Sequence, residues 1–337
     1  MGRRATTLVA VLLLALAGCS RGSPAARPAS TAAVRWELWR HAPAVVDLTA
    51  PRTDGRLTVA AAGHLWLLGT AGGDPQLLPG GYATDPGPEP YAALGTGATV
   101  DGAGCAFGRD EVYAIEPGGR PGVVAVDAQG RPRRFADLPG VMPNGIAFDD
   151  VGKFGHRLLV TGAVKGSVKV YAIDCTGAVT VIAGHAPTME GGLAMAPASF
   201  GGFGGDLIGP DENSGQIWAV RPDGTASLVA KSGLPTGGDI GVEAAGFVPA
   251  GFTVDWSAYV ADRRSPGNPH PGDDSVLRLS GAQLTAADVR PGDLLVASEG
   301  GAATVAVRCA ATCTVRHIAD GPKVAHVEGH VIVAPSR

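Results

Sequence analysis

Short apolar runs alternate with polar, glycine-bearing turns along most of the chain, and one such unit recurs. Residues 143–160 hold the apolar run Ile146-Ala147-Phe148, a polar turn and a second apolar run. Residues 190–208 repeat this design 47 residues later, and a weaker third copy spans residues 243–260. Repeats of about 40 to 50 residues, each holding several short strands, are typical of the blades of a β-propeller.

Strand-like segments bounded by turn residues can be grouped into six such units. The units cover residues 36–80, 104–135, 141–183, 190–230, 239–279 and 293–319. Residues 81–97, rich in Pro and Gly, are interpreted as an irregular insertion. The apolar run at residues 327–334 is left over, and a propeller needs such a strand to join its two chain ends within one sheet. We predict a single all-β, six-bladed propeller of four-stranded antiparallel blades, closed by pairing of the N- and C-terminal strands, with seven blades as the alternative.

Composition agrees with an all-β domain and narrows the class of partners. The chain has 337 residues, of which 51 are Gly, 26 are Pro and only 17% are charged, so tight turns are favoured over long helices. The 45% hydrophobic content is enough for a substantial core. The net charge is −4, and no basic run follows Arg3-Arg4, so the phosphate-neutralising surface that nucleic acid demands is not visible.

The N-terminus has the pattern of a bacterial lipoprotein signal. Residues 1–18 combine the positive Arg3-Arg4 with an apolar run that is short for a membrane span, and they end before Cys19 in a Leu-Ala-Gly-Cys sequence. We predict that Cys19 carries a lipid anchor; a plain secretory signal with a chance Cys is the alternative. Residues 19–35 should form a disordered tether, and residues 36–337 the propeller. The domain is then expected on the outer face of the cell membrane, as a monomer.

The remaining four cysteines are expected to form disulfides, because an exported domain lies in an oxidising compartment. Cys309 and Cys313 flank the tip of a predicted hairpin, which leaves Cys105 to pair with Cys175. The alternative is a zinc site made by Cys309, Cys313 and His317, for which a fourth ligand is not apparent.

Several oxygen ligands occupy similar positions in different repeats. Aligning the repeats on their prolines brings together the candidate ligands Asn144, Glu190, Glu243 and Glu328, and Asp239 is a further candidate. Carboxylate and amide oxygens are the ligands that hard cations prefer, so a ring of blade starts could hold a divalent cation, with Ca²⁺ favoured. The alternative is that these side chains cap turns or face solvent.

A second candidate metal site lies near the C-terminus. His326, Glu328 and His330 alternate along a predicted strand, which would place their side chains on one face. Imidazole ligands favour zinc or copper. The alternative is an ordinary polar face of a terminal strand.

The sequence Pro143-Asn144-Gly145-Ile146-Ala147-Phe148-Asp149 resembles the Pro-Asn-Gly motif of six-bladed propellers in the SMP-30/gluconolactonase and strictosidine-synthase-like group, and loosely that of NHL-type propellers. The resemblance implies that Asn144 ligates a divalent cation in the central channel, together with carboxylates from other blades. It also implies metal-dependent lactonase activity.

These observations leave several functions open. The first hypothesis is a binding propeller that holds a small molecule or protein partner at its channel mouth, using the insertions at residues 81–97 and 262–274. The second is a metal-dependent lactonase or related hydrolase, and a more distant one is a quinone-dependent sugar dehydrogenase. The predicted propeller, residues 36–337, has no Gly-x-Ser-x-Gly elbow and no phosphate-binding Gly-rich loop with Lys, which disfavours common serine hydrolases and nucleotide enzymes.

Overall fold

The computed structural model describes Gly2, residues 34–84 and residues 89–336, and it is built almost entirely of β-strands. Val34 to Ser336 lie in one compact unit, which covers residues 33–337. The predicted signal segment and Cys19 lie outside the described residues.

Four separate antiparallel sheets each contain four strands that follow one another in sequence. The first sheet is β2 (Val45–Leu48), β3 (Leu57–Ala61), β4 (His64–Leu68) and β5 (Gln76–Leu77). The second is β6 (Ala92–Leu94), β7 (Val112–Glu116), β8 (Gly122–Val126) and β9 (Pro132–Asp137). The third is β10 (Met142–Phe148), β11 (Leu158–Val164), β12 (Ser167–Ile173) and β13 (Val179–Ala186). The fourth is β14 (Ala194–Met195), β15 (Leu207–Asp211), β16 (Gln216–Val220) and β17 (Ala226–Lys231), with the short 3-10 helix η1 (Gly201–Phe203) between β14 and β15.

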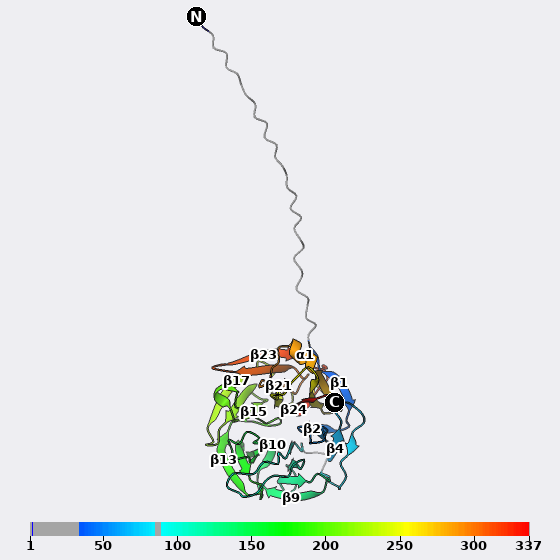
Figure 1. The fold of residues 1–337 in the computed structure, drawn as a ribbon, viewed down its shortest axis with the longest axis vertical. Helices are drawn as coiled ribbons and strands as arrows, with labels where there is room; N and C mark the ends of the chain where they lie inside the picture. The colour runs from blue at the N-terminus through cyan, green and yellow to red at the C-terminus, as the bar shows by residue number, and fades with distance from the viewer. Residues whose placement is uncertain (1, 3–33, 85–88, 337) are drawn as a thin grey trace. The chain divides into compact units, whose positions relative to one another are not determined.

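The sheets are arranged around a common centre, with β2, β10 and β24 near it and β9, β13 and β17 at the outside (Figure 1). The sequence fits this arrangement, because the inner and middle strands are mostly apolar and buried, whereas outer strands such as β9 and β17 carry charged residues. All residues of β8 are buried, for example, but β9 exposes most of its side chains. The core therefore lies between neighbouring sheets, as in the aromatic contact between Phe107 and Phe148, whose ring centroids are 4.8 Å apart.

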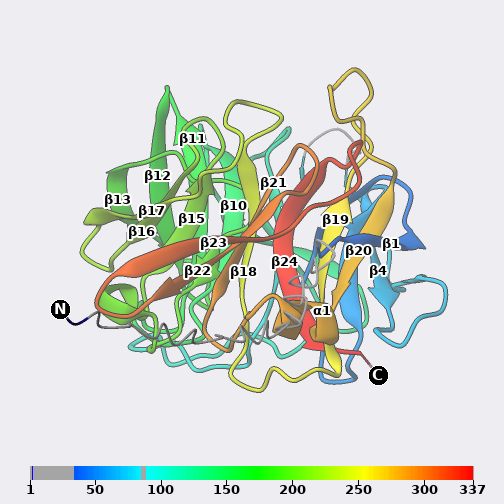
Figure 2. The same cartoon turned by 90° about the horizontal axis from the view of Figure 1, so that it is seen from above.

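The fifth sheet has eight strands, and its order does not follow the sequence. It contains, in spatial order, β1 (Glu37–His41), β20 (Ser275–Ser280), β19 (Trp256–Asp262), β24 (Val327–Pro335), β18 (Val242–Phe247), β21 (Leu294–Ser298), β22 (Thr304–Cys309) and β23 (Cys313–Ala319). Its two halves are joined by the parallel pair Ala245↔His330 and by the isolated bridge Gly300↔His326. Figure 2 shows β24 between β18 and β19. The short helix α1 (Gly281–Ala286) leads from β20 back to β21.

This order corrects the predicted unit at residues 239–279. β18 pairs with β21, whereas the β19–β20 hairpin pairs with β24 and β1. The two chain ends do share a sheet, as ring closure requires, but β1 and β24 do not pair directly because β19 and β20 lie between them.

The predicted second unit also needs correction. Its first strand is β6, which lies within residues 81–97, the segment expected to be irregular. Residues 104–107 contribute only an isolated bridge from Ala106 to Thr99. Tyr91 and the two alanines that follow it are buried against neighbouring sheets, and this burial overrides the turn-rich composition around them.

Both predicted disulfides are confirmed. Cys105 and Cys175 link the second and third sheets, and Cys309 and Cys313 close the hairpin between β22 and β23. The alternative zinc site is wrong, because both thiols are in a disulfide and His317 bonds Asp320 at 3.0 Å. Among the described residues, no helix is long and apolar enough to cross a membrane.

Candidate metal-binding site

Polar side chains gather where the innermost strands of the sheets begin. The innermost strands of neighbouring sheets run in the same direction, as shown by the parallel pairs Gly145↔Gly191 and Ala245↔His330. Their first residues therefore meet at one end of the central region. The side chains contributed in this way are those of Glu89, Tyr91, Asn144, Glu190, Glu243 and Glu328. We call this region the acidic end.

A second set of charged residues reaches the acidic end from the next strand of each sheet. Glu212 directly follows β15, Arg263 follows β19 and Glu299 follows β21. Each of these strands runs antiparallel to an innermost strand, so its last residue lies where that innermost strand begins.

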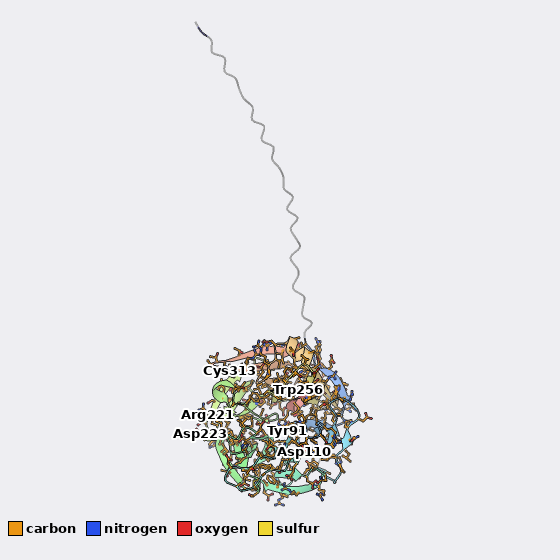
Figure 3. The ribbon with its side chains drawn as sticks, viewed as in Figure 1. Tyr91, Asp110, Arg221, Asp223, Trp256 and Cys313 are labelled. Carbon is orange, nitrogen blue, oxygen red and sulfur yellow. A yellow bond between two sulfur atoms is a disulfide. The ribbon has the colours of Figure 1, made fainter. Side chains whose placement is uncertain are left out.

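The hydroxyl of Tyr91 stands among three carboxylates. It lies 2.5 Å from Oε1 of Glu243, 2.5 Å from Oε2 of Glu328 and 3.2 Å from Oε2 of Glu89. A phenol has one proton to donate, so it cannot satisfy three ionised carboxylates at once. Burial, followed by the charges of Glu243 and Glu328, raises the pKa of Tyr91 well above its usual value, so the phenol keeps its proton. Figure 3 places Tyr91 near the centre of the body.

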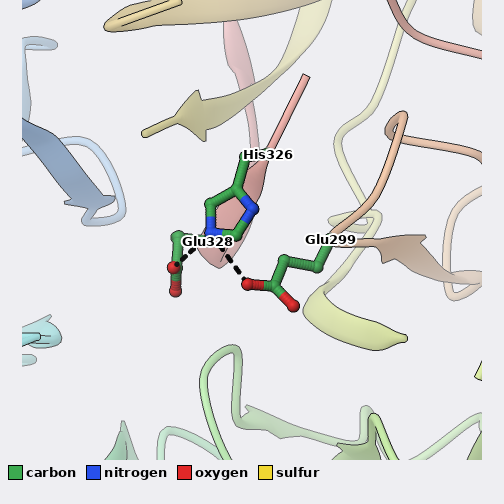
Figure 4. A group of neighbouring side chains, drawn as sticks. All are labelled: Glu299, His326 and Glu328. Carbon is green, nitrogen blue, oxygen red and sulfur yellow. Dashed lines mark ion pairs between the residues drawn. The ribbon is translucent and has the colours of Figure 1, made fainter. Parts of the chain in front are cut away.

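His326 joins two carboxylates on the other side of Glu328. Its Nε2 lies 2.8 Å from Oε1 of Glu299 and 3.3 Å from Oε1 of Glu328 (Figure 4). Burial alone would lower the pKa of His326, but the hydrogen bonds to Glu299 and Glu328 raise it to about 9. The imidazole is therefore cationic at neutral pH. Its Nδ1 and the second oxygen of Glu299, Oε2, are buried without a hydrogen-bond partner among the described residues.

Carboxylates outnumber cations at the acidic end. Arg263 pairs with Glu89 and, at 3.1 Å, with Glu328, and His326 supplies the other positive charge. Six carboxylates share these two cations: Glu89, Glu190, Glu212, Glu243, Glu299 and Glu328. Burial, with the charge of Glu328, raises the pKa of Glu243 well above its usual value and that of Glu299 to about 7. Buried carboxylates in excess of their partners form a donor set that suits a hard divalent cation.

Three overlapping groups bring their ligand atoms within 4.8 Å of one another. They are Glu89 with Glu243 and Glu328, Glu212 with Glu243 and Glu299, and Glu299 with His326 and Glu328. These acidic groups could hold a metal ion.

Of the predicted ligands, Glu243 and Glu328 lie in these groups. Asn144 and Glu190 lie beside them: Nδ2 of Asn144 donates to Oε2 of Glu190 at 3.2 Å, and Oδ1 of Asn144 is buried without a partner among the described residues. Asp239 belongs to none of the groups. It lies in an exposed turn with a φ of 64°, and it is its backbone N–H that reaches Glu212, at 3.2 Å.

The structure separates His330 from His326 and so corrects the second candidate site. Gly329 adopts a φ of 66°, and the register with β19 shifts across this segment, which breaks the alternation assumed for the strand. Nδ1 of His330 lies 3.0 Å from the carboxylate of Asp47, and Nε2 lies 3.0 Å from the carbonyl oxygen of Ile146. Both ring nitrogens are thus occupied by protein groups.

Sequence reasoning missed Glu89, Tyr91, Glu212, Arg263 and Glu299. Glu89 and Tyr91 lie in the segment interpreted as an insertion, and Glu212 was not among the predicted ligands. The position of Glu212 and Glu299 in the sequence could have identified them. Glu212 directly follows β15 and Glu299 directly follows β21, and each of these strands pairs with an innermost strand.

A cleft of about 570 Å³ opens beside the acidic end. Glu89, Tyr91, Asn144 and Glu190 form its polar wall. The rest of its lining is largely apolar and includes Met142, whose residue surface is 59% exposed. A small organic molecule can therefore reach the carboxylates from this side.

Solved structures share the fold at low sequence identity. Regucalcin, a calcium-binding protein from Agrobacterium tumefaciens, is 14% identical with a TM-score of 0.51, over 89% of this chain and 82% of that chain. A streptogramin B lyase is 11% identical with a TM-score of 0.50, over 89% of this chain and 94% of that chain. A gluconolactonase from Xanthomonas campestris is 15% identical with a TM-score of 0.41, over 68% of this chain and 70% of that chain. The first two matches support the propeller-like arrangement of the sheets.

No protein-family model and no curated protein matches the chain.

Proposed function

We propose that the chain is a six-bladed propeller that hydrolyses lactone or related ester bonds with the help of a divalent cation held at its acidic end. The eight-stranded sheet then counts as two blades, β18-β21-β22-β23 and β24-β19-β20-β1, because β18 and β24 share the single paired position Ala245↔His330. The observation that carries the proposal is the convergence of Glu89, Glu243 and Glu328 on the single hydroxyl of Tyr91, beside an open cleft.

The residues present fit a hard cation. Glu89, Glu243 and Glu328 would hold it, and the buried, unpartnered Oδ1 of Asn144 offers a further oxygen nearby. A bound divalent cation would act as a Lewis acid toward a carbonyl oxygen of the substrate. Calcium is favoured, because all of these donors are oxygens and because regucalcin, a calcium-binding protein, has a similar fold.

The chain's own groups would handle the proton and orient the substrate. Burial, followed by the charge of Glu212, raises the pKa of Glu190 to about 7. A carboxylate with such a pKa, lining the cleft, is suited to take a proton from an attacking water molecule at neutral pH. The hydrogen bond from Asn144 orients Glu190, and the apolar part of the lining, which includes Met142, would contact apolar atoms of the substrate.

Hydrolysis of a panel of small lactones by the purified full chain tests this function. We expect acid release that depends on added Ca²⁺ and disappears with chelator. Glu190→Gln should lower kcat by about 10²-fold or more while Ca²⁺ binding persists, as expected for loss of a general base. Glu37→Gln, which changes an exposed carboxylate of β1, is the matched control and should keep full activity. Ca²⁺ binding without hydrolysis of any lactone would favour the alternative, a binding propeller that holds its ligand in the same cleft.

We also propose that the domain is tethered to the outer face of a bacterial membrane through a lipid on Cys19. The support is the Leu-Ala-Gly-Cys sequence at the end of the N-terminal apolar run. Cys19→Ala should abolish incorporation of labelled palmitate and release the chain from membranes. Persistent labelling of that variant would show that the lipid is elsewhere.

A further inference from the structure

Two sets of three carboxylates share one residue at the acidic end. Glu89, Glu243 and Glu328 form the first set, and Glu212, Glu243 and Glu299 form the second. Within each set the ligand atoms lie within 4.8 Å of one another. Glu243 therefore stands between two places where three carboxylates converge.

The second set contains a buried oxygen without a partner among the described residues, although Glu212 accepts hydrogen bonds from Asn213 and from the backbone N–H of Asp239. The first set receives the hydroxyl of Tyr91 and the guanidinium of Arg263. In the second set, Oε1 of Glu299 is paired with His326, but Oε2 has no partner among the described residues. Glu299 is only 3% exposed, so water in the bulk solvent does not satisfy that oxygen. A buried carboxylate oxygen without a donor is costly, and it points to a missing positive partner.

The geometry of Glu299 supports a ligand on this side. Figure 4 shows one oxygen turned toward His326 and the other turned away from it. The backbone also brings Glu299 close to Glu243, because the N–H of Glu299 bonds the carbonyl of Gly241 at 2.6 Å, two residues before Glu243. The two carboxylates are thus held close together by adjoining strands rather than by flexible loops.

Glu243 is equally constrained. Its carbonyl oxygen accepts the N–H of Gly192 at 3.0 Å. A Cβ atom at Gly191 would lie 2.4 Å from Cγ of Glu243, so only glycine at position 191 leaves room for this side chain. The protein thus keeps a carboxylate at the point shared by both sets, although burial there is unfavourable for an ionised group.

We propose that the acidic end holds two divalent cations, with the carboxylate of Glu243 shared between them. The first lies among Glu89, Glu243 and Glu328, and the second among Glu212, Glu243 and Glu299. The first is the cation of the proposed function, and the second goes beyond it. Both donor sets consist of carboxylate oxygens, so the ions are hard cations such as Ca²⁺ or Mn²⁺. A carboxylate shared by two ions is a common feature of two-metal sites.

Cation stoichiometry of the purified full chain tests the proposal. Titration calorimetry with Ca²⁺ should give two ions per chain in the parent. Glu299→Gln and Glu89→Gln should each give one ion, and Glu243→Gln should weaken both sites by at least tenfold. Glu37→Gln, the exposed control on β1, should keep two ions. If Glu299→Gln fails to fold, Glu212→Gln, at a less buried position, provides the same test of the second site.

Manganese gives an independent measurement. Two Mn²⁺ ions sharing a carboxylate should give a spin-coupled paramagnetic resonance spectrum in the parent, and Glu299→Gln should convert it to that of an isolated ion. One ion per chain in the parent, or two ions retained in Glu299→Gln, would overturn the second site and leave the first in place. No bound ion in the parent would overturn the cation of the proposed function as well.

Discussion

Two buried charged regions on the innermost strands differ in one respect, the match between donors and acceptors. Asp47 on β2 and His330 on β24 form a closed pair. The carboxylate of Asp47 accepts backbone N–H groups from Leu48, Ala92 and His330 and the ring Nδ1–H of His330. Nε2 of His330 donates to the carbonyl of Ile146. Every donor meets an acceptor, and the charges cancel.

The acidic end has the opposite character. It combines six carboxylates with two cations and leaves buried oxygens of Asn144 and Glu299 without partners among the described residues. A closed pair such as Asp47 and His330 needs nothing from outside, and its hydrogen bonds connect strands of four sheets. An excess of buried acceptors needs an external cation or bound protons. The difference separates a structural pair from a candidate binding site.

The largest expected effect comes from opening the closed pair. Asp47→Ala should lower the free energy of unfolding by about 3–5 kcal/mol, because it leaves a buried imidazolium without its counter-charge. Urea denaturation of the full chain measures this loss. Asp47→Asn, which keeps an acceptor oxygen, should lower the free energy of unfolding by less. A loss below about 1 kcal/mol in Asp47→Ala would show that water replaces the carboxylate and that the pair is not closed.

Adding Ca²⁺ should raise the free energy of unfolding, because the ion binds at the acidic end of the folded chain. At a free concentration a hundredfold above Kd, one bound ion should raise the free energy of unfolding by about 2.7 kcal/mol. Glu243→Gln should abolish most of this gain, whereas His330→Gln should retain it. Thermal unfolding with Ca²⁺ and with chelator provides the comparison. An equal gain in Glu243→Gln would place the ion elsewhere.

Without a cation, the acidic end should make stability depend on pH. Burial, with the charge of Glu328, raises the pKa of Glu299 from an ordinary 4.5 to about 7, so the folded chain binds this proton more tightly than the unfolded chain does. That contribution is complete below about pH 4.5 and is lost as the pH rises through about 7. The free energy of unfolding should therefore fall by roughly 2–3 kcal/mol over this range. Glu299→Gln should flatten the profile measured in chelator, and an unchanged slope would assign it to other groups.

The smallest effect is expected at Asp239. Its exposed side chain lies outside the three carboxylate groups, so Asp239→Asn should change the free energy of unfolding by less than about 0.5 kcal/mol. The Kd of the Asp239→Asn variant for Ca²⁺, measured by titration calorimetry, should match that of the parent. A tenfold weaker affinity would instead restore Asp239 as a ligand.

The sequence by itself determined the features that depend on local pattern. Repeated apolar runs and glycine turns predicted an all-β propeller arrangement, and the structure confirms it. Cysteine parity predicted both disulfides. The repeat alignment identified Glu190, Glu243 and Glu328 as residues in similar positions, because side chains at equivalent blade starts must meet at one end when the innermost strands run in the same direction.

Only the tertiary structure decided which strands pair and which charges meet. The pairing of β18 with β21 depends on contacts between residues about 50 positions apart. A local apolar pattern does not specify such long-range contacts. Burial against other sheets made Ala92–Leu94 a strand and brought Glu89 and Tyr91 to the acidic end. The left-handed backbone at Gly329 turned His330 away from His326 and toward Asp47, 283 residues earlier in the chain. Packing between sheets fixed these outcomes, because buried polar groups must find partners wherever the fold places them.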